Sequence, residues 1–485
     1  MSDFPCRSAI HHQHAFMNYY GMDREGLTVV DRRSMLKAGL AGIAGLSLPE
    51  LIRTRVEAAD AERATSEAKS VILLWMAGGP SQIDMWDVKP DRPDLNRGPF
   101  DSIPTKLTDV RICEHLPKQA AMLDKFTLIR SVDAQFSNHR PNNVFQTGNL
   151  DANSAEKQYP AIGSVIAKLR GSNHPSMPPY VATSPTPRKD IAPAGSLGKR
   201  YDPFIANNAT KLPIFSFEGE DTGKVGGGNL FELPAGLSID RLHSRQTLLS
   251  DFDRLRENLD LGGSMESANA YQQQAVEMVA GGRAQSAFDL SCEPAENRER
   301  YGKHLWCQQA LLARRLVEAG VTYVTVGLTY GGGADWDHHG DQFPPYGGIN
   351  NGLRRMLPVF DHLLSTLVTD LEERGMLDKV LVLALGEFGR TPIIGTQEGP
   401  NGNGRNHWPP VMSMALAGGG LRHGQVIGAT DAAGGAIKDR AVTPPDLAAT
   451  IYRYMDVPLD ATYLDNRGRP HYIIQNNGQP IRELF

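Results

Sequence analysis

The stretch VILLWMAGGPS, residues 71–81, decides the fold of this 485-residue chain. Its first six residues are a continuous apolar run, which is typical of a strand buried on both faces of a sheet. The two glycines and Pro80 then end the strand in a loop where a backbone can approach a ligand closely. The stretch therefore predicts a buried strand whose carboxyl end opens into a functional loop.

The same kind of apolar run recurs along the chain. Further strand candidates are residues 127–130, 321–326, 380–385 and 412–417. Apolar side chains at helical spacing from Leu353 to Leu371 predict an amphipathic helix that ends at Gly375 and leads into the next strand. Helices followed by buried strands favour an α/β fold with a mostly parallel central sheet and helices on both faces.

Domain organisation and partners follow from composition. We expect one α/β domain over residues 70–485, with an irregular insertion at about 172–263, where Pro, Gly and Asn are frequent and periodic apolar runs are absent. A net charge of −5 offers no basic surface, so we exclude nucleic-acid binding.

The N-terminal residues 1–58 have the pattern of a twin-arginine signal peptide with a long n-region. Arg32 and Arg33 precede a Gly- and Ala-rich apolar run at 38–48 that is too short to span a bilayer. Cleavage after Ala58 would leave residues 59–69 as a linker. We expect a periplasmic or secreted protein without a transmembrane anchor; a cytoplasmic amphipathic helix is the alternative.

Four cysteines occur in the chain, and none forms a CxxC pair. Cys6 would leave with the signal, and Cys113, Cys292 and Cys307 would remain. Either a single bridge from Cys292 to Cys307 or free buried thiols fit this number.

Polar clusters follow the predicted strand ends. Their chemically active members are Ser81, Asp84 and Asp87; His139 and Arg140; Asp337 and His339; Glu387 and Arg390; and Arg405 and His407. Carboxylates suit divalent cations, and zinc, manganese and iron also accept imidazole, so this recurrence predicts a metal site. The three arginines would clamp an oxyanion through paired hydrogen bonds, which points to phosphate or sulfate esters.

Each cluster also has a structural interpretation. Asp84 and Asp87 suit turns or caps, His139 suits a local backbone contact, and Asp337 with His339 suits a loop network. Glu387 is harder to explain in this way, because a carboxylate after a buried strand needs a partner. Packing is the favoured role of two further residues, Trp336 and Trp408.

Taken together, the separated motifs resemble a bacterial family known as domain of unknown function 1501, from about Val71 to the C-terminus. The motifs are 78-GGPSxxD-84 with Asp87 and Pro90, 97-RGPF-100, 336-WDxH-339, 387-EFGRTP-392 and 404-GRxHW-408. That family looks like a branch of the alkaline phosphatase and sulfatase superfamily. The resemblance implies a sulfatase-like α/β sandwich with metal ligands at the carboxyl ends of its strands.

The resemblance also implies individual roles. Asp84 would lie on the first metal-binding loop, Asp337 and His339 on the second, Glu387 where the superfamily usually places an Asp-His pair, and His407 on the last.

The chain departs from the family pattern in three places. Gln82 stands where the family commonly has His, and Asn406 where it has Asp. The superfamily's nucleophile position, sought within residues 138–148, holds no hydroxyl or thiol. Ser81, Ser137 or a metal-activated water would have to attack instead.

The leading hypothesis is an exported metal-dependent hydrolase of phosphate or sulfate esters, on a small molecule or a polysaccharide. One or two divalent ions, Zn, Mn, Ca or Mg, would be held by Asp84, Asp337, His339, Glu387 and His407. Ser81 or water would attack, His139 would protonate the leaving group, and Arg390 and Arg405 would hold the anion. The alternatives are a non-catalytic anion- or carbohydrate-binding protein on the same fold, and a structural partner in an exported assembly.

Overall fold

An eight-stranded sheet forms the centre of the structure, in the order β14-β4-β13-β10-β1-β9-β5-β6. Neighbouring strands run parallel except in the two pairs that involve β13. The strands are β14 (Gln425–Ile427), β4 (Phe126–Val132), β13 (Met412–Gly418), β10 (Val380–Leu385), β1 (Ser70–Trp75), β9 (Tyr323–Gly327), β5 (Tyr180–Thr183) and β6 (Phe204–Ile205). The mostly parallel α/β sheet is confirmed.

The computed structural model describes residues 68–139, 144–153, 158–184, 190–210, 212–215, 221–226, 275, 278–279, 282–329, 335–340, 347–395, 403–465 and 468–485. The predicted signal peptide, most of the predicted linker and Arg140 lie outside these residues. No helix in the described part of the chain is long and apolar enough to cross a membrane.

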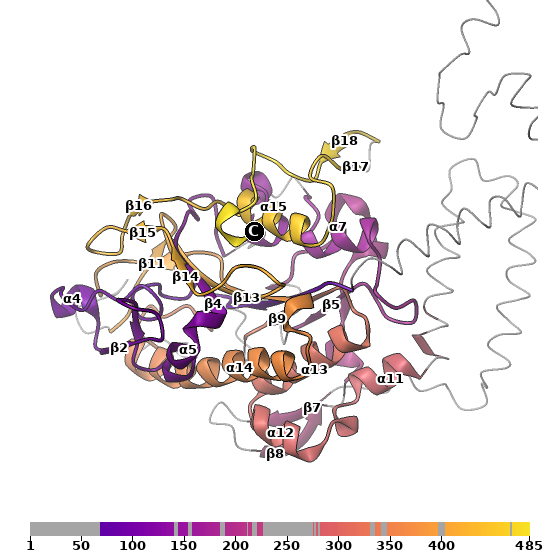
Figure 1. Ribbon diagram of the computed structural model, residues 1–485, viewed down its shortest axis with the longest axis horizontal. Helices are drawn as coiled ribbons and strands as arrows, with labels where there is room; N and C mark the ends of the chain where they lie inside the picture. The colour runs from indigo at the N-terminus through magenta and orange to yellow at the C-terminus, as the bar shows by residue number, and fades with distance from the viewer. Residues whose placement is uncertain are drawn as a thin grey trace, which may run out of the picture. The chain divides into compact units, whose positions relative to one another are not determined.

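Strand β1 is buried on both faces, and its alternate side chains belong to two separate cores. Trp75 and the other odd-numbered residues pack in the core that includes α7 (Ile162–Leu169) and α15 (Pro444–Tyr454). Leu74 and the other even-numbered residues pack with α13 (Leu305–Ala319) and α14 (Arg354–Glu373). Figure 1 shows these helix pairs on opposite faces of the sheet. Each fully buried large apolar side chain stabilises the fold by about 1.5–3 kcal/mol.

The predicted helix is α14, which ends just before Gly375, a residue with φ of 65°. A buried ion network anchors it: Arg314 of α13 has no exposed surface, contacts Glu293, and places its Nε 2.9 Å from Asp370 of α14. Because a buried charge without a partner costs several kcal/mol, this network fixes how α13 and α14 pack.

Shorter elements surround the sheet. The remaining α-helices with described bounds are α4 (Asp94–Arg97), α5 (Pro117–Ala121), α6 (Val144–Thr147), α11 (Arg283–Phe288) and α12 (Ala295–Tyr301). Antiparallel pairs join β2 (Ser102–Pro104) to β3 (Arg111–Cys113), β7 (Leu212–Phe215) to β8 (Asp221–Gly226), β11 (Gly389–Arg390) to β12 (His407–Trp408), β15 (Ala429–Thr430) to β16 (Ile437–Asp439), and β17 (Thr462–Leu464) to β18 (Pro470–Tyr472).

The predicted irregular insertion is wrong at its start. Strands β5 and β6 lie within residues 172–263 and form one edge of the central sheet, where β5 pairs with β9. Four and two residues are too short for an apolar period to stand out in the sequence. Residues 227–263 lie outside the described part of the chain.

The three cysteines of the described residues are free thiols, so the open question between a bridge and free thiols is answered in favour of thiols. Cys113 and Cys307 are buried, and Cys292 is exposed.

Candidate metal centre

The predicted polar clusters meet at one edge of the sheet. Strands β1, β9 and β10 run parallel to one another, and β4 points the same way because β13 is antiparallel to both β4 and β10. The segments that follow β4, β9 and β10 carry His139, Asp337 with His339, and Glu387, respectively. His407 arrives on β12, where it pairs with Arg390 of β11.

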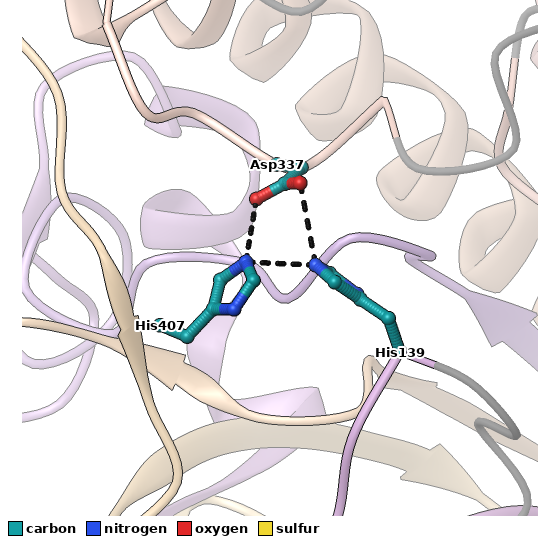
Figure 2. A group of neighbouring side chains, drawn as sticks. All are labelled: His139, Asp337 and His407. Carbon is teal, nitrogen blue, oxygen red and sulfur yellow. Dashed lines mark hydrogen bonds and ion pairs between the residues drawn. The ribbon is translucent and has the colours of Figure 1, made fainter. Parts of the chain in front are cut away.

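Three side chains from these segments point their polar atoms at one another, as Figure 2 shows. The Nε2 atoms of His139 and His407 are 2.8 Å apart. The carboxylate of Asp337 places Oδ2 3.2 Å from Nε2 of His139 and Oδ1 3.0 Å from Nε2 of His407.

His339 joins the same group. Its Nε2 lies 2.7 Å from Oδ1 of Asp337 and 3.0 Å from Nε2 of His407. Three imidazole nitrogens therefore lie within 3.2 Å of the carboxylate of Asp337, and those of His139 and His407 form with it a group whose ligand atoms are close enough together to share one ion. We call these four residues, His139, Asp337, His339 and His407, the metal centre.

The Nδ1 atoms of His139 and His339, which face away from the centre, each have a hydrogen-bond partner. Nδ1 of His139 lies 2.7 Å from Oε1 of Glu387, and Nδ1 of His339 lies 3.2 Å from Oδ1 of Asn406. A carboxylate only accepts hydrogen bonds, so Nδ1 of His139 must carry the hydrogen. In a neutral ring this leaves the Nε2 lone pair facing the centre, which is how ligand histidines are oriented in metal sites.

The donor set fits a metal ion. Lone pairs and a carboxylate packed this closely repel each other unless a positive charge lies among them. Three imidazoles and one carboxylate suit an ion that takes five or six ligands, such as five-coordinate zinc or manganese, and leave it a position for water. Calcium and magnesium favour all-oxygen sites, so this set suits them less well.

The charges of the centre shift its pKa values. Burial raises the pKa of Asp337, but hydrogen bonds from His139, His339 and His407 and the charge of Arg390 outweigh it and hold that pKa far below its usual range. Burial lowers the pKa of His139, but hydrogen bonds to Asp337 and Glu387 and their charges raise it overall to about 9. Burial lowers the pKa of His407. Without an ion, a proton on His139 would balance negative charge from Asp337 and Glu387.

Glu387 supports the centre from outside. Its Oε1 accepts the backbone N–H of Gly78 at 2.8 Å and the ring Nδ1–H of His139 at 2.7 Å, while Oε2 is buried with no hydrogen-bond partner. The ring of Phe388 lies 4.7 Å from those of both His139 and His407. Glu387, predicted as a metal ligand, instead holds the ring of His139 and the backbone of Gly78.

Arg390 is not placed to clamp a substrate anion, and that prediction is wrong. The side chain is fully buried; Nε donates to the carbonyl of Gly79 at 2.7 Å, and Nη1 to that of Arg405 at 3.1 Å. Nη2 donates to the carbonyl of Trp336 at 3.0 Å and to Oδ1 of Asp337 at 2.7 Å. Arg390 instead holds Asp337 in position.

Asp84, Ser81 and Arg405 form a separate buried cluster. Oδ2 of Asp84 accepts from Ser81 Oγ at 2.6 Å and from Arg405 Nε at 2.7 Å, and Oδ1 accepts from Arg405 Nη2 at 3.1 Å. The predictions of Asp84 as a ligand, Ser81 as a nucleophile and Arg405 as an anion clamp do not agree with these contacts, because each group is already bound within the protein.

A close backbone approach brings the last ligand to the centre. A Cβ on Gly404 would lie 1.9 Å from the carbonyl oxygen of His339. The next residue, Arg405, donates its backbone N–H to the carbonyl of His338 at 2.8 Å. Only glycine permits this contact, which sets His407 beside Asp337.

Two departures from the family pattern acquire roles here. The buried amide of Gln82 donates to the carbonyls of Arg390 and Gly434 and accepts the backbone N–H of Arg390, so it joins the loop after β1 to β11. Asn406 orients His339. The sequence offered no signal for this second role beyond the position of Asn406 beside His407.

The remaining predicted residues have structural roles. Asp87 lies 2.9 Å from Lys89 and accepts the hydroxyl of Thr430 at 2.5 Å. The indole of Trp336 stacks on that of Trp306, and Trp408 donates to the carbonyl of Gly435. The two tryptophans therefore pack as predicted, whereas Asp87 is held by side-chain contacts and not by the predicted turn or cap.

Residues 68–485 match the family described as "Protein of unknown function (DUF1501)". No curated protein matches the chain. Among solved structures, it is similar to the PsFucS1 sulfatase from Pseudoalteromonas sp. (11% identity, 88% of this chain and 72% of that one, TM-score 0.36). It is also similar to human ectonucleotide pyrophosphatase / phosphodiesterase 5, with 8% identity over 80% of this chain and 95% of that one and a TM-score of 0.34. A third similar structure is a phosphonate monoester hydrolase from Silicibacter pomeroyi, with 10% identity over 85% of this chain and 75% of that one and a TM-score of 0.30. We transfer no residue role from likenesses of this size.

Proposed function

The chain belongs to the family described as "Protein of unknown function (DUF1501)", and we propose that this member is a metal-dependent hydrolase of phosphate or sulfate esters. The single observation that carries the proposal is the contact of three Nε2 atoms with the carboxylate of Asp337, beside the carboxyl ends of β4, β9 and β10. Open α/β sheets place their ligands at that edge.

The ion would be held by the metal centre, His139, Asp337, His339 and His407. Zinc or manganese, which accept imidazole, are the best candidates. When bound, such an ion polarises an ester oxygen and makes a water molecule acidic enough to attack at neutral pH. This is the chemistry that hydrolysis of a phosphate or sulfate ester requires.

The protein residues around the ion would position it. Glu387 holds the ring of His139, Asn406 holds that of His339, and Arg390 holds the carboxylate of Asp337. His139 cannot protonate a leaving group while its Nε2 binds an ion and its Nδ1 donates to Glu387. We therefore assign His139 to ion binding rather than to acid catalysis.

Water is the nucleophile that the contacts favour. The Ser81 hydroxyl is 2.6 Å from Asp84 and buried. The hydroxyl of Ser137, two residues before His139, is buried without a hydrogen-bond partner. Ser137 is thus the better candidate if a protein hydroxyl attacks.

A non-catalytic anion- or carbohydrate-binding protein is the second candidate. It is favoured by one observation: among the described residues, Ser81, Arg390 and Arg405 are all engaged by protein groups, so the expected nucleophile and two of the three expected anion-binding arginines are occupied.

Elemental mass spectrometry of chelator-free protein tests the proposal, with an Asp337→Asn, His339→Ala double variant beside it. The control is His423→Gln, which replaces a partly buried histidine that hydrogen-bonds Thr127 and Gly418 instead. We expect bound zinc or manganese in the wild type and control, none in the double variant, and ion-dependent release of phosphate or sulfate from aryl esters.

The outcomes separate the candidates. Bound ion without hydrolysis of any ester would favour the binding protein. If the folded wild-type protein bound neither zinc nor manganese at any ion concentration near neutral pH, both the metal centre and the proposed hydrolase activity would be contradicted.

We also propose that the protein is exported. The support is the twin-arginine pattern at residues 31–48, which lies outside the described residues.

A further inference from the structure

The loop after β1 carries an aspartate that the family resemblance assigns to a metal. Asp84 is almost completely buried, as a ligand of a second ion would be. In the structure, however, its two carboxylate oxygens are taken by Ser81 and by two nitrogens of Arg405.

The guanidinium of Arg405 is fully satisfied. Besides the two bonds to Asp84, Nη1 donates to the carbonyls of Thr391 and Pro392 at 3.0 and 2.9 Å. Nη2 also donates to the carbonyl of Asn96 at 2.8 Å. An arginine has five N–H donors, and all five have acceptors here.

The motif 97-RGPF-100 closes over this pair. Gly98 has φ of 83°, and a Cβ at that position would lie 2.6 Å from Oδ1 of Asp84 and 3.2 Å from Nη2 of Arg405. The neighbouring motifs around Asp84 and Gly98 and the distant motif around Arg405 therefore together form one buried ion pair.

We propose that the protein binds a single ion, at the metal centre, and that the guanidinium of Arg405 is a permanent cation in the place where Asp84 would otherwise bind a second one. This inference rests on the proposed metal centre. It goes further by assigning the number of ions and by removing Asp84 and Ser81 from the reacting groups.

Charge and desolvation support this arrangement. A divalent ion bound to Asp84 would lie beside the buried guanidinium and be repelled by it. Displacing Arg405 would leave its charge buried without a partner, which strongly destabilises a folded protein. A second ion would have to overcome both effects. At the metal centre, Arg390 contacts Oδ1 of Asp337 and leaves Oδ2 to face His139, whereas Arg405 occupies both carboxylate oxygens of Asp84.

The test measures ion stoichiometry and thermal unfolding, without reference to activity. The proteins are the wild type, Asp84→Asn, the charge-free double variant Asp84→Leu, Arg405→Met, and Asp337→Asn. Each is titrated with zinc and, separately, with manganese after chelator treatment. The double variant is included because Asp84→Asn leaves Arg405 without its counter-charge and can lower stability enough to prevent folding.

We expect one equivalent in the wild type and in each folded Asp84 variant, with dissociation constants within about twofold, and a loss of binding in Asp337→Asn. Two equivalents in the wild type, or a drop by one equivalent in an Asp84 variant, would overturn the inference. One equivalent without ester hydrolysis would count against the proposed function alone. No ion in the folded wild type would overturn the inference together with the centre.

Discussion

Nη2 of Arg390 lies 2.7 Å from Oδ1 of Asp337, and the same guanidinium donates through Nε to the carbonyl of Gly79. A single buried side chain thus links the loop after β1 to the carboxylate that receives all three histidines. The position of Asp337 depends on this link, because residues that orient a ligand contribute strongly to metal affinity.

Arg390→Lys keeps the charge but cannot reproduce the forked contacts. We expect ion affinity to fall by about 10–100-fold, the usual effect of losing such a support. The measurement is a competition titration against a chromophoric chelator. The control is Arg314→Lys, another fully buried arginine, which should lower the melting temperature and leave ion affinity unchanged. Equal affinity in both variants would show that Arg390 serves stability only.

Glu387→Gln tests the support of His139. The amide can still accept a hydrogen bond from the ring but carries no charge to make it more basic, so we expect about a 10–100-fold loss of ion affinity with the fold retained. Isothermal titration with zinc would measure it. Circular dichroism controls for folding, and an unchanged dissociation constant in a folded variant would contradict the role assigned to Glu387.

Asn406→Asp should act in the opposite direction. A carboxylate beside Nδ1 of His339 makes that ligand more basic, and we expect ion affinity to rise by about tenfold. Asn350→Asp changes the net charge equally at a residue that contacts Arg354. It should leave affinity unchanged. The prediction fails if the two variants bind zinc alike.

Gly404→Ala would force the backbone of Gly404 away from the carbonyl of His339. We expect a lower melting temperature, by several degrees, together with weaker ion binding because His407 moves. Gly395→Ala is the matched control in the same connection, since a Cβ there meets nothing within 4 Å. Differential scanning fluorimetry with and without zinc compares the two, and equal melting curves would disprove the close approach.

The stability of the fold should fall in acid partly through His304. This residue caps α13, where its ring accepts the backbone N–H of Trp306, and burial lowers the pKa of His304 from 6.5 to about 4. As the pH falls, His304 is therefore protonated in the unfolded chain before it is protonated in the folded protein. The contribution of neutral His304 to the free energy of unfolding is complete above pH 6.5. It is lost as the pH falls toward 4, by up to about 3 kcal/mol.

His304→Asn keeps a capping side chain and removes this titration. We expect the melting temperature of the wild type to fall more than that of the variant between pH 7.5 and 4.5. Parallel declines would show that His304 does not carry the effect.

Much of the fold could be predicted because its main strands are long apolar runs. Residues 71–76 and 380–385 differ from the observed β1 and β10 by one residue at most. Strands β5 and β6 could not be predicted, because segments of four and two residues are too short to show a repeating apolar pattern. The antiparallel direction of β13 has no signature in a buried strand either, because both of its faces are apolar.

The site was predicted in part. Asp337, His339 and His407 do lie together: the first two follow β9, and His407 reaches them on β12, which pairs with β11 just after β10. Sequence alone could not tell which charged groups face one another: Arg405 pairs with Asp84, and Arg390 turns inward. His139, expected to donate a proton, lies in the metal centre because Glu387 fixes its ring. These are properties of side-chain direction, which depends on the packed structure.

The position of β1 affects the order in which the chain can fold. Ser70 pairs with Val380, so the first strand of the sheet lies beside a partner that is synthesised far later. At usual rates of translation, β1 would wait about 15–60 s for β10 to emerge. During that time its apolar residues are open to pairing with other chains. Truncated products that end before Val380 should therefore aggregate, and the burden on chaperones should be greatest during synthesis.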